Sequence, residues 1–515
     1  MSSITTDHTF CAKHQDAISG VLSCFDRVIF RGYTPLSYPK GIAGFFWQQK
    51  VPLKDFKDYA PKIAERIKGH VKSTVLAAGA PFRHLTRKEP MEELARRMAR
   101  EKGIDEGIVC GFSQMETCRT YRFWYDKAAG RPALVKDFRK CSVVYVFLMH
   151  AVLGLIHVKI ETWFPLTMQV YVNGHDYLAK KLDRAGVKYA LHDNAFTMIE
   201  NFKAAQGHAD RFAKQNWPKL LGELARRFNP LVGKELRAQD YYWVMDQVEM
   251  ATDVVFKDRS RLASLYPRLI EHARACFTAE DVLKFLGRKL NANFRGEVQT
   301  WIKRRVEGVR VVHKMKKNKL KMYDKAGNVL RVETTLNDPK EFRVWRQNDA
   351  GKMEWQPLRK GVAWLWRYAE VGQASNSRYL EALSVVTDDR EARKLIDRAT
   401  KPADLNGRRK RALQPLGPDD QKLFLAVMRG EHRLRGFRNR ELEQHLYVTM
   451  PNDKAEARRR CGRVTRLIQV LRAHGLVAKV PHTRRYRITV EGELLMSAAI
   501  KVKDLHLPLT MSSAA

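Results

Sequence analysis

The sequence predicts a multidomain α+β protein with an antiparallel sheet body, a helical subdomain and a C-terminal winged-helix domain. Three observations support this fold class. Residues 107–173 contain apolar runs rich in Val, Ile, Phe, Tyr and Thr, which favour antiparallel strands. Residues 205–290 contain long stretches with helical periodicity. The tail from Pro418 to about Lys501 combines helical segments with two short strand-like segments.

We expect six consecutive regions along the chain. They are an α-rich region at 1–105, an antiparallel sheet α+β region at 106–204, a helical subdomain at 205–300, a second sheet and helix region at 301–400, a basic linker at 401–415 and a winged-helix domain at 416–503. The linker is expected because the segment ending in NGRRKRALQP is charged, contains Gly and Pro, and lacks apolar periodicity.

The first two regions supply most of the expected sheet. CFDRVIFRG, which begins at Cys24, has the composition of a strand, whereas PKIAERIKGHVKSTVLAAG and PMEELARRMAREKG have helical periodicity. Further strands are expected in GIVCGFS, CRTYRFWYD, SVVYVFLMH, GLIHVKIETWF and TMQVYVNG. GHDYLAKKLDRAG then predicts a short amphipathic helix that ends at Gly186, and VKYALHDNAFTMIE predicts another strand.

Helices and then a hairpin are expected in the next two regions. The clearest helical segments are FAKQNWPKLLGELARRFN, YYWVMDQVEMATDVVF and SLYPRLIEHARACF. VRVVHKMKKNKLKMYDKAGNVLRVETTLND predicts a hairpin or a pair of strands, because β-branched residues lie on both sides of the turn sequence YDKAGN. We assign this hairpin to a second sheet.

The charge of the chain indicates a polyanionic partner. It contains 94 Lys and Arg against 56 Asp and Glu, which gives a formal net charge of +38. Because 44% of the residues are hydrophobic, the chain can form packed cores and the charge must lie on folded surfaces. Nucleic acid is the commonest partner that neutralises such an excess. This composition argues against an ordinary small-molecule enzyme.

Other features of the composition concern the cellular compartment. No apolar run approaches the roughly 18 residues of a membrane span, and the N-terminal residues lack the apolar core of a signal peptide. The seven cysteines are odd in number and form no CxxC pair, which argues against a disulfide framework and a structural zinc site. We therefore expect a cytoplasmic, nucleoid-associated protein without a membrane partner.

Three helices are expected in the tail, in DDQKLFLAVMRG, RNRELEQHLY and EARRRCGRVTRLIQVLRAHG. Two short strands follow, LVAKVP and RYRITV, joined by the basic tip HTRR. This order of three helices and a two-stranded wing resembles the winged-helix domains of bacterial transcription regulators. The resemblance implies that the third helix enters a major groove and that the wing contacts a neighbouring phosphate or the minor groove. Solvated arginine faces and protein-binding winged helices are the alternative. The expected nucleic-acid-binding residues are Arg458, Arg459, Arg463, Arg466, Arg484 and Arg485, with Lys316, Lys317, Lys319, Arg408, Arg409 and Lys410 elsewhere.

The segment KLKMYDKAGNVLRVE, from Lys319 to Glu333, resembles part of the rolling-circle replication initiators of phages and plasmids. In those proteins a tyrosine attacks a DNA phosphodiester and acidic side chains hold a divalent ion. The resemblance therefore implies Tyr323 as a candidate nucleophile and Glu333 as a candidate metal ligand. The HxH metal pair of many initiators is absent here. A plain basic hairpin would show the same alternation of residues.

A second acidic constellation lies in AQDYYWVMDQVEMATDVVFKD, which contains Asp240, Asp246, Glu249 and Asp253. On one helix the last three acids would share a face, which would suit Mg²⁺. The alternative is an acidic face that pairs with the protein's own arginines. Asp26 on the first strand, with Asp193 after His192, is a further candidate pair, because nucleases of the ribonuclease H type need acids on two strands.

Three functional hypotheses follow. The first is a nucleic-acid-binding protein that grips a large structured RNA or DNA and docks on duplex through its winged helix. Aromatic and basic residues alternate at 119–124, 342–346 and 364–368, a composition that suits unpaired bases, and core packing is the alternative explanation for each ring. The whole chain also resembles uncharacterised bacterial proteins present in many copies per genome, which implies a mobile element. The alternatives are a metal-dependent nickase or transposase and a ligand-sensing transcription regulator. The sequence leaves the oligomeric state open.

Overall fold

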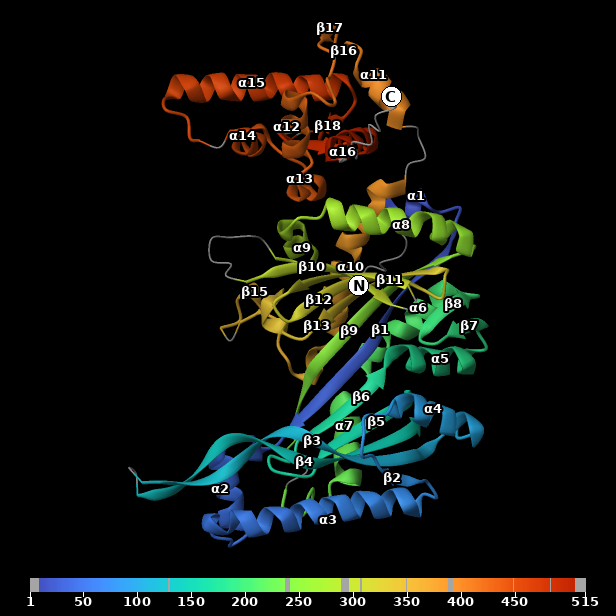
Figure 1. Cartoon of the computed structure of the whole chain (residues 1–515), viewed down its shortest axis with the longest axis vertical. Coiled ribbons are helices and arrows are strands. Elements are labelled where there is room, and N and C mark those ends of the chain that lie inside the picture. Colours follow the sequence, from blue (N-terminus) through green and yellow to red (C-terminus); the bar gives the residue numbers. More distant parts are fainter. Residues whose placement is uncertain are drawn as a thin grey trace, which may run out of the picture. The chain divides into compact units, whose positions relative to one another are not determined.

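A computed structural model describes residues 9–127, 130–236, 241–288, 296–305, 308–348, 350–387, 392–447, 449–481 and 483–504 (Figure 1). The chain divides into two compact units. The sheet unit comprises Ile18–Arg259 and Ile302–Asn376, and the helical unit comprises Met1–Ala17, Ser260–Trp301 and Ser377–Ala515. Both units are therefore built from segments that are distant in the sequence, whereas the sequence predicts consecutive regions.

One sheet of eleven strands dominates the fold, in the order β10-β11-β12-β13-β9-β1-β6-β5-β4-β3-β2. From β11 to β3 each strand pairs antiparallel with the next, whereas β2 and β3 are parallel. The strands are β1 (Ile18–Tyr33), β2 (Phe82–His84), β3 (Gly107–Asp126), β4 (Arg131–His150), β5 (Gly154–Glu161), β6 (Met168–Asn173), β9 (Tyr242–Phe256), β10 (Val298–Arg305), β11 (Gly308–Met315), β12 (Asn318–Lys325) and β13 (Val329–Leu336). The α+β class and the strand in CFDRVIFRG are as predicted.

The segment Tyr242–Phe256 is strand β9, so the prediction of a helix there is wrong. Nearly all of its residues are buried, with side chains of both faces inside the protein. A strand covered on both faces has no apolar alternation, and its acids at spacings of three and four residues imitate a helical face. β9 lies between β1 and β13 in the middle of the sheet.

The hairpin around YDKAGN belongs to this same sheet and not to a second one. It consists of β12 and β13, and β11 pairs with the other edge of β12. Ala326 and Gly327 both have positive φ in the three-residue loop between Lys325 and Val329, a conformation that glycine adopts without strain. The large sheet thereby brings residues 318–336 beside residues 18–33 and 242–256.

Helices cover the sheet, and short hairpins extend from it (Figure 1). In α3 the apolar residues Ile63, Ile67, Val71 and Val75 recur every four positions and are buried, so one stripe of the helix packs on the protein. The helices of the sheet unit are α2 (Pro39–Gln48), α3 (Phe56–Ala77), α4 (Met91–Glu101), α5 (Gly174–Ala185), α6 (Phe202–Asp210) and α7 (Trp217–Phe228). Its two hairpins are β7 (Tyr189–His192) with β8 (Ala195–Ile199) and β14 (Arg343–Gln347) with β15 (Met353–Pro357). The helix α10 (Leu365–Leu383) begins in this unit and ends in the helical unit.

The helical unit contains the three helices and the two-stranded wing that the sequence predicts. Val464, Ile468 and Leu471 of the long helix pack into a core with Leu423, Leu442 and other residues of neighbouring helices. The elements are α1 (Thr9–Lys13), α8 (Arg259–Ala275), α9 (Ala279–Phe285), α11 (Ala392–Ala399), α12 (Pro418–Val427), α13 (Gly430–Arg435), α14 (Asn439–Leu446), α15 (Lys454–Ala473), α16 (Val490–Asp504) and the wing strands β18 (Val477–Lys479) and β19 (Tyr486–Ile488).

Residues expected to form a basic linker instead form a small hairpin, β16 (Ala403–Leu405) and β17 (Arg408–Lys410). Asn406 and Gly407, both with positive φ, make its turn, and the Asp404 carboxylate of β16 accepts the Gly407 backbone N–H at 2.8 Å. The hairpin packs on α15, and Lys410 donates to Gln469 of that helix at 2.8 Å. Strands of three residues are too short to show a periodic pattern, so the sequence of this segment predicts a linker.

Among the described residues, no helix combines the length and apolar character that a bilayer crossing demands.

Candidate metal centre and nucleic-acid interface

Three carboxylates meet in the middle of the large sheet. Asp26 comes from β1, Glu249 from β9 and Glu333 from β13, which are neighbouring strands. One carboxylate oxygen from each lies within 4.8 Å of the other two, and all three residues are buried. Burying carboxylates is costly unless cations or hydrogen bonds compensate them. Such a group therefore requires an explanation, particularly in a chain whose net charge is +38.

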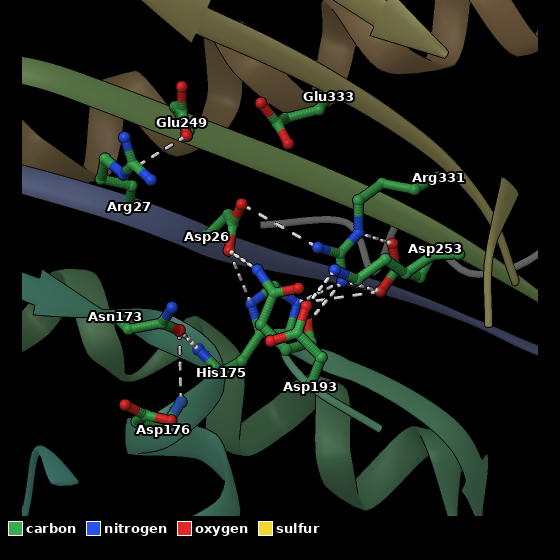
Figure 2. Close-up of polar contacts among 12 residues, drawn as sticks. Asp26, Arg27, Asn173, His175, Asp176, Asp193, Glu249, Asp253, Arg331 and Glu333 are labelled. Atoms are coloured by element: carbon green, nitrogen blue, oxygen red, sulfur yellow. Dashed lines mark hydrogen bonds and ion pairs between the residues drawn. The ribbon is translucent and has the colours of Figure 1, made fainter. Parts of the chain in front are cut away.

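A β-bulge places Asp26. The pairing of β1 with β9 passes from Phe25 opposite Met250 to Arg27 opposite Glu249, so Asp26 has no partner of its own on β9. An extra residue of this kind bends a strand and redirects a side chain. The Asp26 carboxylate consequently reaches a group of polar side chains below the strand (Figure 2).

Lys321 bridges two of the three carboxylates. Its ammonium lies 3.1 Å from Glu249 and forms a short contact with Glu333. The Tyr323 hydroxyl donates to the other Glu333 oxygen at 2.5 Å. Burial raises the pKa of Glu333 above its ordinary value, and the nearby Glu249 and Asp26 act in the same direction against Lys321. The environment of Glu333 thus favours its protonated form.

The other side of the cluster is organised by Arg331. Its Nε and Nη2 atoms donate to the two oxygens of Asp253, each at 2.7 Å, and its Nη1 lies 3.9 Å from Asp26 (Figure 2). Burial opposes ionisation of Asp253, but Arg331 and His175 outweigh it and lower the pKa of Asp253 below its ordinary value. The pKa of Asp26 is lowered in the same way, against burial, by His175 and Arg331. Both aspartates are therefore ionised at neutral pH.

The start of α5 places His175 between these two aspartates. Asn173 caps the helix, since its side-chain oxygen accepts the backbone N–H groups of His175 and Asp176 at 2.8 and 3.3 Å. His175 Nδ1 lies 3.4 Å from Asp26, and Arg331 Nη2 lies 3.1 Å from His175 Nε2. Because a guanidinium nitrogen can only donate, a neutral ring would accept at Nε2 and carry its proton on Nδ1, toward Asp26. Burial and Arg331 oppose protonation of the ring, but Asp253 and Asp26 outweigh them and raise the pKa of His175 above its ordinary value.

The donor set suits a hard divalent cation. Asp26, Glu249 and Glu333 supply oxygen ligands, which Mg²⁺ and Mn²⁺ prefer. Including Asp253, the network holds four carboxyl groups against the three cations Arg27, Lys321 and Arg331, so it is short of positive charge when every acid is ionised and His175 is neutral. A metal between Glu249 and Glu333 would take the place of the Lys321 ammonium. An ion-pair network that joins β1, β9, β12 and β13 is the structural alternative.

The structure separates the acids that were predicted to share a helical face. Asp246 bonds Arg31 at 2.9 Å and lies at a bulge in β9, whereas Asp253 is held by Arg331. Only Glu249 joins Glu333, so the predicted metal set of Asp246, Glu249 and Asp253 is not assembled. The reason is that β9 is a strand and not a helix. Asp240 lies outside the described residues.

Asp193 and Tyr323, two other predicted site residues, are not placed for the roles expected of them. Asp193 lies in the turn between β7 and β8, where it forms an ion pair with Lys325 and its side chain is 68% exposed. Tyr323 is only 8% exposed, and burial beside Glu333 raises its pKa well above the ordinary value. A buried neutral phenol whose hydroxyl is donated to a carboxylate is poorly placed to attack a phosphodiester. His175 and Lys321 were not predicted as site residues, and Arg331 was expected only as part of a plain basic hairpin.

A second group of potential ligands lies in the helical unit. One ligand atom each from Glu431, His432 and His445 lies within 4.8 Å of the others. His445 Nε2 lies 2.9 Å from Glu431, and His432 Nδ1 lies 2.9 Å from the Ala426 carbonyl. Lys284 is 3.7 Å from Glu431 and already supplies a positive charge there.

The sheet unit also has a cavity of about 760 Å³ beside α4 and β3. Its lining includes Arg87, Lys88, Glu89 and Glu116 as well as apolar side chains. Glu116 is bonded by Lys159 at 2.7 Å and by the Tyr145 hydroxyl at 2.5 Å. This mixed lining differs from the closed apolar pocket expected of a sensor for a hydrophobic ligand.

The long helix α15 has a basic exposed face. Arg459, Arg463 and Arg466 recur at intervals of four and three residues, so they form one row on the side opposite the buried Val464 and Ile468. All three and the adjacent Arg458 are exposed, and no hydrogen bond or ion pair within the described part of the chain holds their guanidinium groups. These are the third-helix arginines that the sequence predicts as ligands for nucleic acid.

The remaining predicted basic residues differ in their surroundings. Arg484 at the wing and Arg408 and Arg409 on the hairpin beside α15 are exposed. Arg485 instead donates to the Gly436 carbonyl at 3.0 Å and to Glu441 at 3.2 Å, which anchors the wing to α14. In the sheet unit Lys316 forms an ion pair with Glu341, Lys317 is exposed and Lys319 is partly buried. Lys410 bonds α15.

Comparisons of the chain with protein-family models, curated proteins and solved structures give no match. Function is therefore inferred from the residues of this chain.

Proposed function

We propose that this chain is a nucleic-acid-binding protein that docks on duplex through α15 and its wing. The observation that carries the proposal is the row of Arg459, Arg463 and Arg466, exposed and without a partner among the described residues, on the face of α15 opposite its core. Guanidinium groups bind phosphate and guanine in a bidentate manner, and an α-helix fits the major groove. Arg484 on the wing and Arg408 and Arg409 on the neighbouring hairpin extend the same charge.

The test is the salt dependence of duplex binding. The full-length protein is titrated into a labelled duplex between 50 and 300 mM salt, and log K is plotted against log salt. Each phosphate contact contributes about −0.9 to the slope, so Arg459→Ala/Arg463→Ala/Arg466→Ala should reduce its magnitude by about 3.

A matched control removes the same charge elsewhere. Lys57, Lys62 and Lys72 are exposed on α3 of the sheet unit, and Lys57→Ala/Lys62→Ala/Lys72→Ala lowers the net charge by the same amount. The slope should then stay close to that of the unmodified protein. Equal losses in both triple variants would mean that binding follows net charge alone, and the assignment to α15 would fail.

A second candidate function is divalent-metal-dependent cleavage of a nucleic-acid strand, as in a nickase or transposase. It is favoured by the gathering of Asp26, Glu249 and Glu333 within 4.8 Å. A cation held by these carboxylates would neutralise charge that develops on a phosphodiester during attack. Arg331 would then orient Asp253, which it bonds, while the cation would replace the Lys321 ammonium between the two glutamates.

Cleavage is tested with supercoiled plasmid and with labelled single strands, in Mg²⁺ or Mn²⁺ and in chelator. Metal-dependent nicking that is lost in Glu333→Gln and kept in Asp246→Asn would support this function, because Asp246 lies outside the cluster and bonds Arg31. Activity that persists in Glu333→Gln would show that a contaminant or another site is responsible.

The class of nucleic acid is tested by purification from the native host without nuclease treatment. A discrete co-purifying RNA would support a ribonucleoprotein, and DNA ends clustered at one site would support a nickase or transposase. Origin from a mobile element stays a prediction from the sequence.

A further inference from the structure

Tryptophan is concentrated in one small part of the sheet unit. Four of the ten tryptophans in the chain fall between residues 345 and 366. Trp345 and Trp355 face each other across the hairpin β14–β15 as register partners. Their side chains are 46% and 63% exposed, so neither ring contributes a full share to a core. A pair of large rings held in solvent on a regular hairpin indicates a binding surface.

The exposed face of this hairpin is apolar and basic. Alternation along β14 places Arg343, Trp345 and Gln347 on one face of the hairpin. Their cross-strand partners Pro357, Trp355 and Met353 lie on the same face. Met353 is 42% exposed, and Arg343 is exposed beside the ring pair. The two indole rings are 5.6 Å apart at an angle of 61°. At that angle the rings do not cover each other, and ring faces remain available for stacking.

Guanidinium groups surround the adjoining tryptophans. Arg367 lies 4.1 Å from the ring centre of Trp366, and its Nη2 reaches the Trp345 carbonyl at 3.3 Å. Trp364 has Arg346 at 5.8 Å and Arg359 at 5.7 Å from its ring centre. The Nε atoms of Arg346 and Arg367 are buried and have no hydrogen-bond partner. The segment thus combines aromatic faces with several positive charges.

The chemistry of this surface identifies its occupant. An aromatic ring stacks on any base, and nearby Arg and Lys attract the phosphates that link successive bases. Paired bases in a duplex hide their faces, so only an unpaired strand can use such rings. An acidic protein would also neutralise the positive charge, but this would not explain why the faces of two indole rings are exposed.

We propose that the Trp345–Trp355 face of the hairpin β14–β15 stacks unpaired bases of a single-stranded nucleic acid, whose phosphates are held by Arg343 beside the rings. The inference rests on the proposed nucleic-acid-binding function and extends it to a second surface. Duplex binding is assigned to α15 in the helical unit, and single-strand binding is assigned to the sheet unit. The two surfaces can therefore be inactivated separately.

The experiment measures binding of the full-length protein to a labelled (dT)20, a labelled (rU)20 and a 20-base-pair duplex, by anisotropy and by tryptophan quenching. Trp345→Ala/Trp355→Ala should weaken single-strand binding at least about fivefold for each ring lost, which is the smallest loss expected for one stacked base. Duplex affinity should change less than about twofold. Trp345→Phe/Trp355→Phe should restore much of the single-strand affinity, since phenyl rings also stack. The two oligonucleotides distinguish DNA from RNA as the source.

Trp47→Ala is the matched control. Trp47 is 82% exposed on α2, and no guanidinium group among the described residues lies over its ring. This variant should bind every probe as the unmodified protein does. Arg343→Glu provides a second test that spares the rings, and it should weaken single-strand binding alone.

Three outcomes would overturn the proposal. The first is unchanged single-strand affinity in the double alanine variant. The second is an equal loss for duplex and single strand, which would indicate one common electrostatic surface. The third is a change of oligomeric state by sedimentation without a change of affinity, which would assign the face to a second copy of the chain. If the unmodified protein binds none of the probes, the proposed function itself fails.

Discussion

Arg331 and Asp253 face each other across β13 and β9 and form two parallel hydrogen bonds, Nε to Oδ1 and Nη2 to Oδ2, both 2.7 Å long. Their side chains are 0% and 1% exposed. The pair therefore connects two central strands where water cannot replace either partner. His175 contacts the same guanidinium, and Asp26 lies within 4 Å of it, so the pair also supports the acidic cluster.

Removing one partner of this pair should be costly. Arg331→Met leaves the Asp253 carboxylate buried without its cation, and we expect the free energy of unfolding of the sheet unit to fall by about 3–5 kcal/mol. Arg331→Met/Asp253→Leu removes both charges and should recover a large part of that loss. Urea unfolding followed by tryptophan fluorescence measures both effects. A double variant less stable than Arg331→Met would contradict this account.

Lys321 should compete with a divalent cation. Lys321→Met leaves Glu249 and Glu333 without their shared ammonium, so the protein should lose about 3 kcal/mol in chelator. Mn²⁺ should then raise the melting temperature of this variant more than that of the unmodified protein, because ligand binding stabilises the folded state. Lys316→Met, which breaks an exposed ion pair with Glu341, serves as the control. Equal responses to Mn²⁺ in both variants would count against a metal at the cluster.

Tyr323 should act through Glu333 and not as a nucleophile. Tyr323→Phe removes the hydroxyl that Glu333 accepts at 2.5 Å, and we expect stability to fall by about 1–3 kcal/mol. If the protein cleaves DNA, the variant should still do so, and denaturing gels should show no tyrosine-linked DNA with either protein. A covalent adduct that disappears in Tyr323→Phe would restore the role implied by the resemblance to replication initiators.

His313 makes stability depend on pH. It is fully buried on β11, and burial lowers its pKa from 6.5 to about 4. His313 is therefore protonated near pH 6.5 in the unfolded chain but only near pH 4 in the folded protein. The free energy of unfolding consequently falls as the pH drops from 6.5 to 4. At pH 5 the loss is about 2 kcal/mol. His313→Gln should flatten the dependence of melting temperature on pH between 7 and 5. The exposed His192→Gln should leave it unchanged.

Local patterns predicted the helices with one covered face and the strands with short apolar runs rich in β-branched and aromatic residues. The helices α3, α4 and α5 and the strands β1 and β3–β6 follow from apolar spacing and from Gly186, which ends α5 in the left-handed conformation. β9 could not be recognised, because both of its faces are buried and Asp246, Glu249 and Asp253 imitate a helical face. Short strands such as β16 and β17 carry too few residues for any period.

The candidate site was predictable only as separate residues. Glu333, Glu249 and Asp26 are each recognisable as candidate metal ligands. They come together only because β1 pairs with β9 and β9 pairs with β13. The bulge that turns Asp26 inward leaves no signal in a single sequence. The basic face of α15 was fully predictable, because a helical period and a row of arginines are both local properties.

The pairing of β1 with β9 has a consequence for biosynthesis. Fourteen residue pairs join these strands, although more than 200 residues separate them along the chain. At roughly 5–20 residues per second, a ribosome needs roughly 10–40 s to extend from the end of β1 to the start of β9. β6 can cover one edge of β1 earlier, while the other edge stays open. A nascent chain therefore presents an apolar strand edge for many seconds, which makes it a natural client for ribosome-associated chaperones.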